Sequence, residues 1–354
     1  MAVYILRRLL LMIPTLFGVM AVTFLVIQFV PGGPVERMVS LLEKGHNAVG
    51  GEVSSGASPT TGNYRGAQGL DPEQVEQLRR LYGFDKPPLE RFFGMIWNYL
   101  RFDFGESYYY HRTVVDLVLE KMPVSISLGL WTFLLTYLIS IPLGIKKAVR
   151  HQSRFDSWTS TVILAGYSIP GFVLGILLIV LFGGGSFWNL FPMRGLVSDH
   201  WQDLSLMGKI LDYLWHMVLP ITASVIGSFA VMTMLTKNSF LEEISKQYVL
   251  TARAKGLGEN AVLYRHVFRN AMIPLVTGFP GSFVAAFFSG SLLIETIFSL
   301  DGLGLLGYES VINRDYPVVM ATLYFFTLLG LLTKLLTDIT YVMVDPRITF
   351  EKAK

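Results

Sequence analysis

Long apolar stretches alternate with polar segments along the whole chain of 354 residues. A membrane-spanning helix needs about 20 mainly apolar residues. Six stretches reach about that length: residues 9–30, 122–145, 158–182, 213–235, 271–298 and 318–344. The third is interrupted at residues 168–171 (SIPG), and the fifth contains several prolines and glycines. The pattern predicts an all-α polytopic membrane protein with six transmembrane helices.

The longest polar segment, residues 31–121, separates the first two apolar stretches. Within it, residues 45–69 are rich in Gly, Ser and Thr and carry almost no apolar periodicity, so we expect a flexible loop. A helix-start signal at residues 71–74 (DPEQ) and amphipathic patterning beyond it predict a cap of short external helices. We therefore divide the chain into residues 1–30 (N-terminal tail and first span), 31–121 (external segment) and 122–354 (five-helix membrane core).

Basic residues predict the orientation of these spans. Arg7 and Arg8, the loop that contains Lys146 and Lys147, the segment 236–274 and the C-terminal tail fall on one side, and all are basic. Short loops on the other side contain few Lys or Arg, so the positive-inside rule places both termini in the cytoplasm. The first apolar stretch exceeds the roughly 7–15 residues of the apolar core of a signal peptide and lacks a cleavage site, so we expect it to be retained.

Composition and motifs exclude several classes of function. The absence of cysteine excludes disulfides, thiolate metal sites and a cysteine nucleophile. The sequence contains no G-x-x-x-x-G-K-[ST] phosphate loop and no H-E-x-x-H motif, and its six histidines are scattered. Basic residues lie in loops between apolar runs, which indicates membrane topology and not nucleic-acid binding. We expect no catalytic residue, metal or cofactor in this chain.

Breaks in the third and fifth spans identify candidate pathway residues. A proline removes a helix hydrogen bond, and in lipid the freed carbonyl needs another partner. The breaks either serve as packing kinks or line a polar-tolerant pathway near Tyr167, Ser168, Ser289 and Ser291. Glu295, near the outer end of the fifth span, is either a gate residue or an interfacial one.

Two opposite charges lie one helical turn apart in the sixth span, at Lys334 and Asp338. Charged residues inside a membrane are functional candidates by default. Their i,i+4 spacing favours a structural ion pair with each other over a proton relay.

The segment 236–274 is a polar, basic island between apolar stretches. We expect an amphipathic helix over residues 242–255, a turn at residues 256–258 and a second helix over residues 259–271 that leads into the fifth span. On the second helix, one apolar face is expected at Leu263, Val267 and Ala271.

Small side chains at Ala252, Ala254 and Gly256 would let another protein approach this island closely. The island is therefore either a docking element or a solvated cytoplasmic loop that touches anionic lipid.

The island's centre, TARAKG followed by RNAMIP, resembles the EAA loop of permease subunits in bacterial binding-protein-dependent ABC importers of the dipeptide/oligopeptide type. The resemblance extends over nearly the whole chain, through LRRLLLMIPTLFGV, PGGP, LYGFDKP, FDFG, GLG, RDYP and VDPRI. The Gly-rich insertion ending in NYRG and the sequence LTKNSFL are similar to the Yej-type branch, which is associated with uptake of peptides and of the peptide-nucleotide microcin C. Thr251 stands where many family members have Glu, a spelling that is normal in the peptide branch.

This resemblance implies a type I ABC importer permease fold in the bacterial inner membrane. The island would carry a coupling helix that sits in a groove of a cytoplasmic ATPase, and that ATPase would bind ATP and Mg²⁺. A homologous second permease would complete the pathway, and a periplasmic binding protein would deliver the peptide. The implied ATPase-coupling residues are Tyr248, Thr251, Ala252, Arg253, Ala254, Lys255, Gly256 and Leu257.

Two other classes remain open on the residues alone. An ion-coupled secondary transporter would use Lys334 and Asp338 as its relay. A membrane adaptor without transport activity would need neither that pair nor a pathway.

Overall fold

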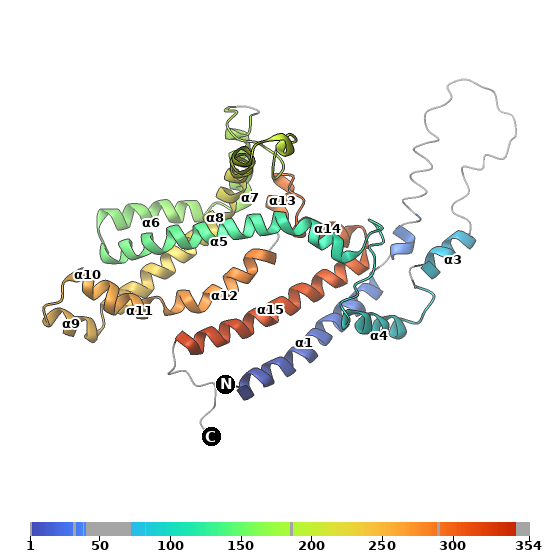
Figure 1. Cartoon of the computed structure of the whole chain (residues 1–354), viewed down its shortest axis with the longest axis horizontal. Coiled ribbons are helices and arrows are strands. Elements are labelled where there is room, and N and C mark those ends of the chain that lie inside the picture. Colours follow the sequence, from blue (N-terminus) through green and yellow to red (C-terminus); the bar gives the residue numbers. More distant parts are fainter. Residues whose placement is uncertain are drawn as a thin grey trace. The chain divides into compact units, whose positions relative to one another are not determined.

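The computed structural model describes residues 2–30, 33–37, 39, 72–81, 83–184, 187–288 and 291–344. Within these ranges the chain forms helices joined by turns, and it forms no β-strand (Figure 1). The all-α prediction is therefore confirmed for the described part of the chain. The expected flexible loop 45–69, Ser289 and the tail after residue 344 lie outside the described residues.

The main helices cover the predicted apolar stretches and parts of the polar segments between them. In chain order they are α1 (Ala2–Phe29), α3 (Pro72–Leu81), α4 (Pro88–Tyr99), α5 (Val114–Val149), α6 (Arg154–Tyr167), α7 (Gly171–Phe182), α8 (Leu206–Ile244), α9 (Gln247–Ala254), α12 (Ile273–Phe288), α13 (Leu292–Ile297), α14 (Leu303–Ile312) and α15 (Tyr316–Val344). Between α9 and α12 the chain forms α10 (Glu259–Ala261), a π-helical segment η3 (Val262–Val267) and α11 (Phe268–Ala271).

Four described helices, α1, α5, α8 and α15, are long and apolar enough to cross a membrane, and α6 with α7 would make a fifth span. With 16 residues, α12 is shorter than the about 20 that a span needs. The expected fifth stretch, residues 271–298, therefore contains two helices, and its crossing stays a prediction.

The third apolar stretch is broken more sharply than a kink. Helices α6 and α7 meet at 92° across residues 168–170. Pro170 precedes α7 and has no backbone N–H, and its ring would clash with the carbonyl four residues earlier in a continuous helix. The interruption predicted there is confirmed, but the stretch is not one straight helix.

The chain divides into two compact units. Unit 1 comprises Met1–Leu10, Leu119–Leu306 and Leu328–Lys354, and unit 2 comprises Leu11–Val118 and Gly307–Thr327. The boundary expected between residues 121 and 122 lies inside α5, which contributes residues to both units.

Unit 2 has an aromatic core and one buried carboxylate. The ring of Phe92 on α4 lies 5.5 Å from that of Phe17 and 5.2 Å from that of Phe24, both on α1. Asp315 is fully buried and accepts hydrogen bonds from the Ser107 hydroxyl and, at 3.0 Å, from the Tyr108 amide. Burial raises the pKa of the Asp315 carboxyl, and these donors oppose the rise. The carboxylate thus ties the loop before α5 to the start of α15.

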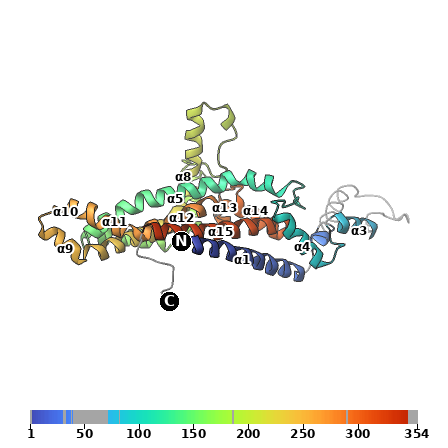
Figure 2. The same cartoon turned by 60° about the horizontal axis from the view of Figure 1, so that its bottom comes forward.

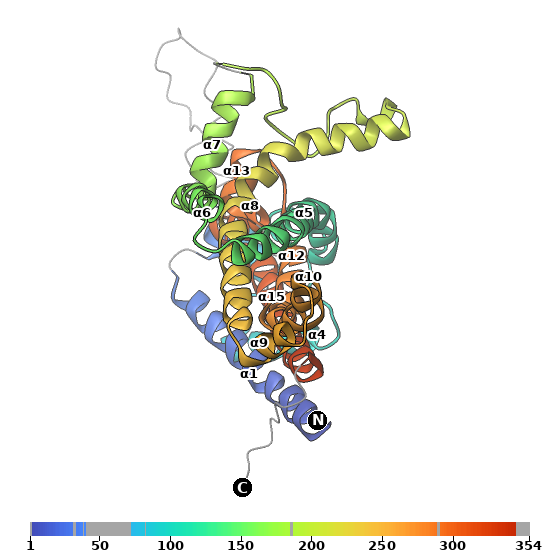
Figure 3. The ribbon, with the colours of Figure 1, turned by 90° about the vertical axis from the view of Figure 1, so that its left-hand side faces the viewer.

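Unit 1 packs α7 and α13 against the long helix α8, and α8 is bent along its length (Figure 3). Pro220, the only proline inside α8, accounts for a bend. Where α5 meets α12, a Cβ on Gly129 would lie 1.7 Å from the Ala286 carbonyl oxygen. Small residues of this kind let helix backbones approach closely in membranes.

Candidate functional site

The predicted coupling segment begins with a break that the sequence did not indicate. Helix α8 ends at Ile244, and α9 starts anew at Gln247, so the single helix expected over residues 242–255 is wrong. The Ser245 hydroxyl donates to the Glu242 carbonyl at 2.8 Å, and Lys246 has an extended backbone that starts the next helix. The Ser245 hydrogen bond and the extended backbone of Lys246 therefore end α8 and separate it from α9.

Glu243 holds this break together from the inside. Its carboxylate pairs with the Lys246 ammonium group and accepts a hydrogen bond from the Tyr248 hydroxyl at 2.7 Å. The contact with Glu243 raises the pKa of Lys246, and burial raises the pKa of Tyr248. Tyr248 is thus half-buried and already bonded within the segment.

A π-helical turn changes the buried face of the second helix. Val262 and Val267 are each 1% exposed, five residues apart, as the i→i+5 bonding of a π-helix allows. Val267 and Ala271 lie on the buried face as expected, but Leu263 is only half-buried. The regular spacing assumed from the sequence therefore fails by one residue at the start of the helix.

The coupling segment rests on one apolar cluster. The cluster joins α5, α8, α9 and the helices that follow, and its buried members are Ile145, Ala148, Phe240, Val249, Ala252, Val262, Val267 and Ala271. Within unit 1, α9 to α11 lie at one end of α8 (Figure 2). A displacement of α9 would therefore act directly on α5 and α8.

The predicted coupling residues fall into two groups. Ala252 is 5% exposed and belongs to the apolar cluster, so it does not offer the exposed small side chain expected of it, and its coupling role stays a prediction. Tyr248 also faces inward, as described above. The exposed members form the tip: Thr251, Arg253, Ala254, Lys255, Gly256 and Leu257.

Two features shape this tip. The Arg253 guanidinium contacts both carboxylate oxygens of Glu259 at 3.0 Å, which closes the turn between α9 and α10. Gly256 has φ +79°, a left-handed conformation that costs other residues about 1–2 kcal/mol. The turn expected at residues 256–258 is therefore confirmed.

A buried charge cluster, here called the lysine clasp, joins α5, α6 and α8. Lys147 is fully buried, and its ammonium nitrogen lies 3.1 Å from the Asp156 carboxylate. Lys237 of α8 contacts the same carboxylate at 2.8 Å. Lys147 also donates to the hydroxyls of Thr159 (2.7 Å) and Ser160 (2.8 Å). The sequence places Lys147 among the exposed loop charges, and only the fold reveals its partners.

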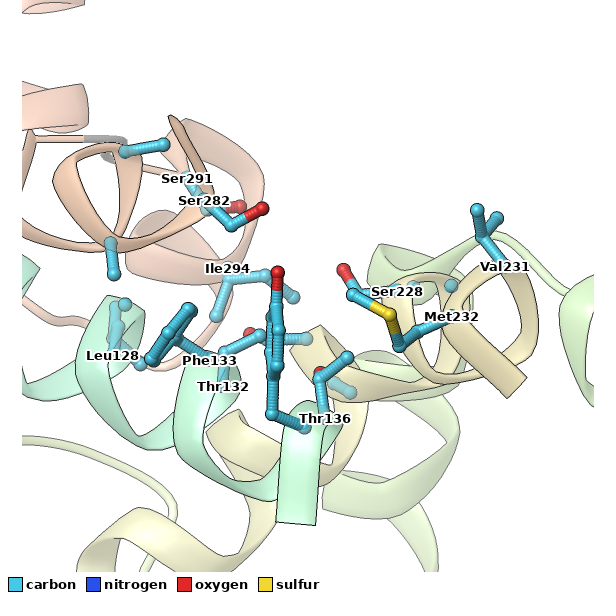
Figure 4. A pocket seen from close by; sticks show the side chains of 18 of the residues that line it. Leu128, Thr132, Phe133, Thr136, Ser228, Val231, Met232, Ser282, Ser291 and Ile294 are labelled. Atoms are coloured by element: carbon cyan, nitrogen blue, oxygen red, sulfur yellow. The ribbon is translucent and has the colours of Figure 1, made fainter. Parts of the chain in front are cut away.

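A cavity of about 850 Å³ lies among α5, the end of α6, α7, α8, α12 and α13 in unit 1. Figure 4 shows labelled side chains from α5, α8 and the α12–α13 region around it. Among the expected pathway residues, Tyr167 and Ser291 line this cavity. Ser168 is exposed and does not line it, because its hydroxyl turns back to the Leu164 carbonyl at 2.9 Å.

Glu295 does not line the cavity either. It is fully buried, and its carboxylate accepts hydrogen bonds from the backbone amides of Ser291 (3.1 Å) and Leu305 (2.7 Å). These bonds hold the loop between α13 and α14 in place. The arrangement favours a structural role for Glu295 over the role of a gate residue, which the sequence alone had allowed.

Asp338 takes its partners from the N-terminus and not from its own helix. Its carboxylate lies 2.8 Å from the Arg8 guanidinium and accepts a hydrogen bond from the Tyr4 hydroxyl at 2.7 Å. The ion pair expected with Lys334 is thus replaced by one that joins α1 to α15.

Comparison with known proteins agrees with this architecture. Residues 140–350 match the family described as "Binding-protein-dependent transport system inner membrane component". The permease protein YejB of a peptidoglycan transport system in Agrobacterium fabrum is 58% identical, with 99% of each chain covered. The inner membrane ABC transporter permease protein YejB of Escherichia coli O157:H7 is 54% identical, over 99% of this chain and 100% of that protein. The dipeptide permease DppB of Escherichia coli K12 is 33% identical, with 99% of each chain covered. The chain therefore belongs to the inner-membrane permease subunits of binding-protein-dependent ABC transporters, with the Yej-type and peptide permeases as relatives.

Proposed function

We propose that this subunit imports peptides together with a homologous second permease, a cytoplasmic ATPase and a periplasmic peptide-binding protein. Relatives named for peptidoglycan and dipeptide transport support the substrate class. ATP and Mg²⁺ would be bound by the ATPase subunits. The single observation that carries the coupling role is the exposed tip, Thr251 and residues 253–257, which packs on the buried apolar cluster.

In this proposal the tip enters a groove of the ATPase, and closure of the ATPases pulls on α9. The apolar cluster transmits that displacement to α5 and α8, because a close-packed core moves as a body instead of deforming. Both helices line the cavity, so its shape would change with the nucleotide state. The basic side chain of Lys255 would meet acidic groups at the groove, whereas Arg253 is already paired with Glu259.

Cysteine cross-linking tests the coupling role directly. The chain contains no cysteine, so Ala254→Cys or Leu257→Cys would give the subunit a single thiol. We expect both variants to cross-link to the ATPase in the purified complex. Arg150→Cys, an exposed position outside the tip, is the matched control and should not cross-link. Failure of the ATPase to co-purify, or equal cross-linking at position 150, would refute the proposal.

The same approach tests the orientation, in which both termini face the cytoplasm. A membrane-impermeant thiol reagent applied to spheroplasts should label Asp103→Cys and leave Arg150→Cys unlabelled. The reverse pattern would overturn the orientation.

Uptake assays separate this function from an ion-coupled transporter. In proteoliposomes, we expect peptide to stimulate ATP hydrolysis and uptake to continue after an ionophore removes all ion gradients. Uptake that stops with the ionophore would favour the ion-coupled alternative at Lys334 and Asp338.

A further inference from the structure

The cavity of unit 1 has an uncharged wall. Its volume of about 850 Å³ lies within the roughly 300–1,000 Å³ typical of ligand pockets. None of the described residues that line it is Asp, Glu, Lys, Arg or His. A charged group that entered would lose hydration without gaining an ionic partner, which is costly. The wall therefore suits neutral groups.

Among the described residues of this wall, the polar side chains are hydroxyls, and four of them come from α5, α8 and α12. Thr132 and Thr136 lie on α5, one turn apart, whereas Ser228 lies on α8 and Ser282 on α12 (Figure 4). A hydroxyl both donates and accepts hydrogen bonds. This combination matches the alternating N–H and C=O groups of a peptide main chain.

Two of these hydroxyls are buried without a partner. Thr136 is only 4% exposed, and within the described part of the chain neither its Oγ1 atom nor that of Thr132 has a hydrogen-bond partner. Thr161 and Thr222 elsewhere in the helices differ, because they bond to the carbonyls of Ser157 and Val218 on their own helices. In the cavity wall, Ser282 likewise donates to the Gly278 carbonyl at 3.2 Å and keeps its acceptor capacity. Neither threonine oxygen has accessible surface in this conformation, so a ligand in the cavity reaches them only after the threonine side chains rotate about their Cα–Cβ bonds. Such a rotation would remove the cost of leaving a buried hydroxyl unsatisfied.

We propose that the hydroxyls of Thr132 and Thr136, with those of Ser228 and Ser282, bind the main-chain amides of the transported peptide. This inference rests on the proposed function and deepens it. Recognition of this kind does not depend on the peptide's side chains. Any charged terminus or side chain must then be stabilised elsewhere in the assembled transporter.

The test uses the complete transporter in proteoliposomes with its binding protein. The double variant Thr132→Val/Thr136→Val keeps the side-chain shape and removes both hydroxyls. We measure kcat/KM of uptake for three tripeptides of equal length: neutral, acidic and basic. Loss of hydrogen bonds to the main chain should lower all three values by a similar factor, about tenfold.

Two further variants control the interpretation. Thr161→Val/Thr222→Val removes exposed hydroxyls outside the cavity and should leave uptake unchanged. Thr132→Ser/Thr136→Ser retains the hydroxyls and should keep most of the uptake, whereas an equal loss would show that hydroxyls are not the cause. Co-purification of all subunits and the rate of ATP hydrolysis without peptide should match wild type.

The possible failures are distinguishable. If wild type carries peptides and the valine variant carries them equally well, the cavity proposal falls and the transport function stands. If the loss depends on the charge of the peptide, side-chain recognition replaces main-chain recognition. If wild type carries no peptide at all, the proposed function falls, and the cavity proposal with it.

Discussion

Two buried polar regions share helix α5, and they differ in how their polar groups are satisfied. In the lysine clasp, the Lys147 ammonium group meets a carboxylate and two hydroxyls of the same subunit. In the cavity, Thr132 and Thr136 have no hydrogen-bond partner within the described part of the chain. Buried polar groups in folded proteins are almost always satisfied.

The difference separates structure from binding. A charge cluster that finds its partners inside the subunit fixes how α5, α6 and α8 are arranged. Unsatisfied hydroxyls on residues that line a cavity leave their hydrogen-bonding capacity to something that enters, once their side chains rotate toward it. Helix α5 therefore carries a structural contact at Lys147 and candidate binding residues at Thr132 and Thr136.

The largest effect should come from the clasp. Asp156→Asn leaves the fully buried Lys147 without a negative partner, and breaking a buried pair in this way costs about 3–5 kcal/mol. We expect a clear drop in the thermal unfolding midpoint of the detergent-solubilised subunit. Asp199→Asn, at an exposed position, is the control and should unfold like wild type.

A second substitution sharpens this result. Adding Lys147→Met to Asp156→Asn removes the unpaired buried charge, and the remaining Lys237 is 13% exposed and can reach water. The double variant should recover part of the lost stability. If Asp156→Asn unfolds like wild type, the clasp is not a structural joint.

The next largest effect on stability is expected from substitutions at two alanines of α9. Ala252→Glu places a carboxylate in the apolar cluster, which costs roughly 3 kcal/mol or more. Ala254→Glu adds the same group at the exposed tip and should change stability by less than about 0.5 kcal/mol.

Two measurements separate these variants. Thermal unfolding should be affected by Ala252→Glu only, whereas co-purification of the ATPase should be weakened by both. Full ATPase binding by Ala254→Glu would mean that the tip is not the docking surface.

Local signals in the sequence located the long helices and the turn at residues 256–258, but not the break between α8 and α9. Apolar length located α1, α5, α8 and α15, and Pro170 marked the break between α6 and α7. These features depend on residues close together in the chain, so periodicity and the chemistry of proline and glycine identify them.

The candidate site was less predictable because its contacts are distant in the sequence. Ala252 has the small side chain of a docking residue, but its burial depends on Phe240 and Val262 on other helices. Asp338 was paired with Lys334 because only neighbours on one helix can be inferred from spacing, whereas its partner Arg8 lies at the other end of the chain. The sequence likewise could not show that the Thr136 hydroxyl lacks a hydrogen-bond partner, because this depends on how several helices pack around the cavity.

A smaller effect is expected at the tip of the coupling segment. Gly256 has a left-handed backbone, so Gly256→Ala should strain the turn by about 1 kcal/mol. We expect amide hydrogen exchange across residues 253–258 to become about fivefold faster. Gly258 has φ −65° and no atom within 4 Å of an added Cβ, so Gly258→Ala is the matched control and should exchange like wild type. Equal acceleration in both variants would show that strain at Gly256 is not the cause.

The smallest effect tests whether an unpartnered hydroxyl matters by itself or only in the cavity. Thr233 on α8 is fully buried and also lacks a hydrogen-bond partner within the described residues, but it lies outside the cavity. Thr233→Val keeps the shape and removes an unsatisfied group, so stability should stay the same or rise by up to about 1 kcal/mol. Thermal unfolding and peptide uptake should both be at least as good as in wild type. If Thr233→Val lowers uptake as much as Thr132→Val/Thr136→Val does, the position of the hydroxyl at the cavity wall is irrelevant. The contrast between the lysine clasp and the cavity then fails.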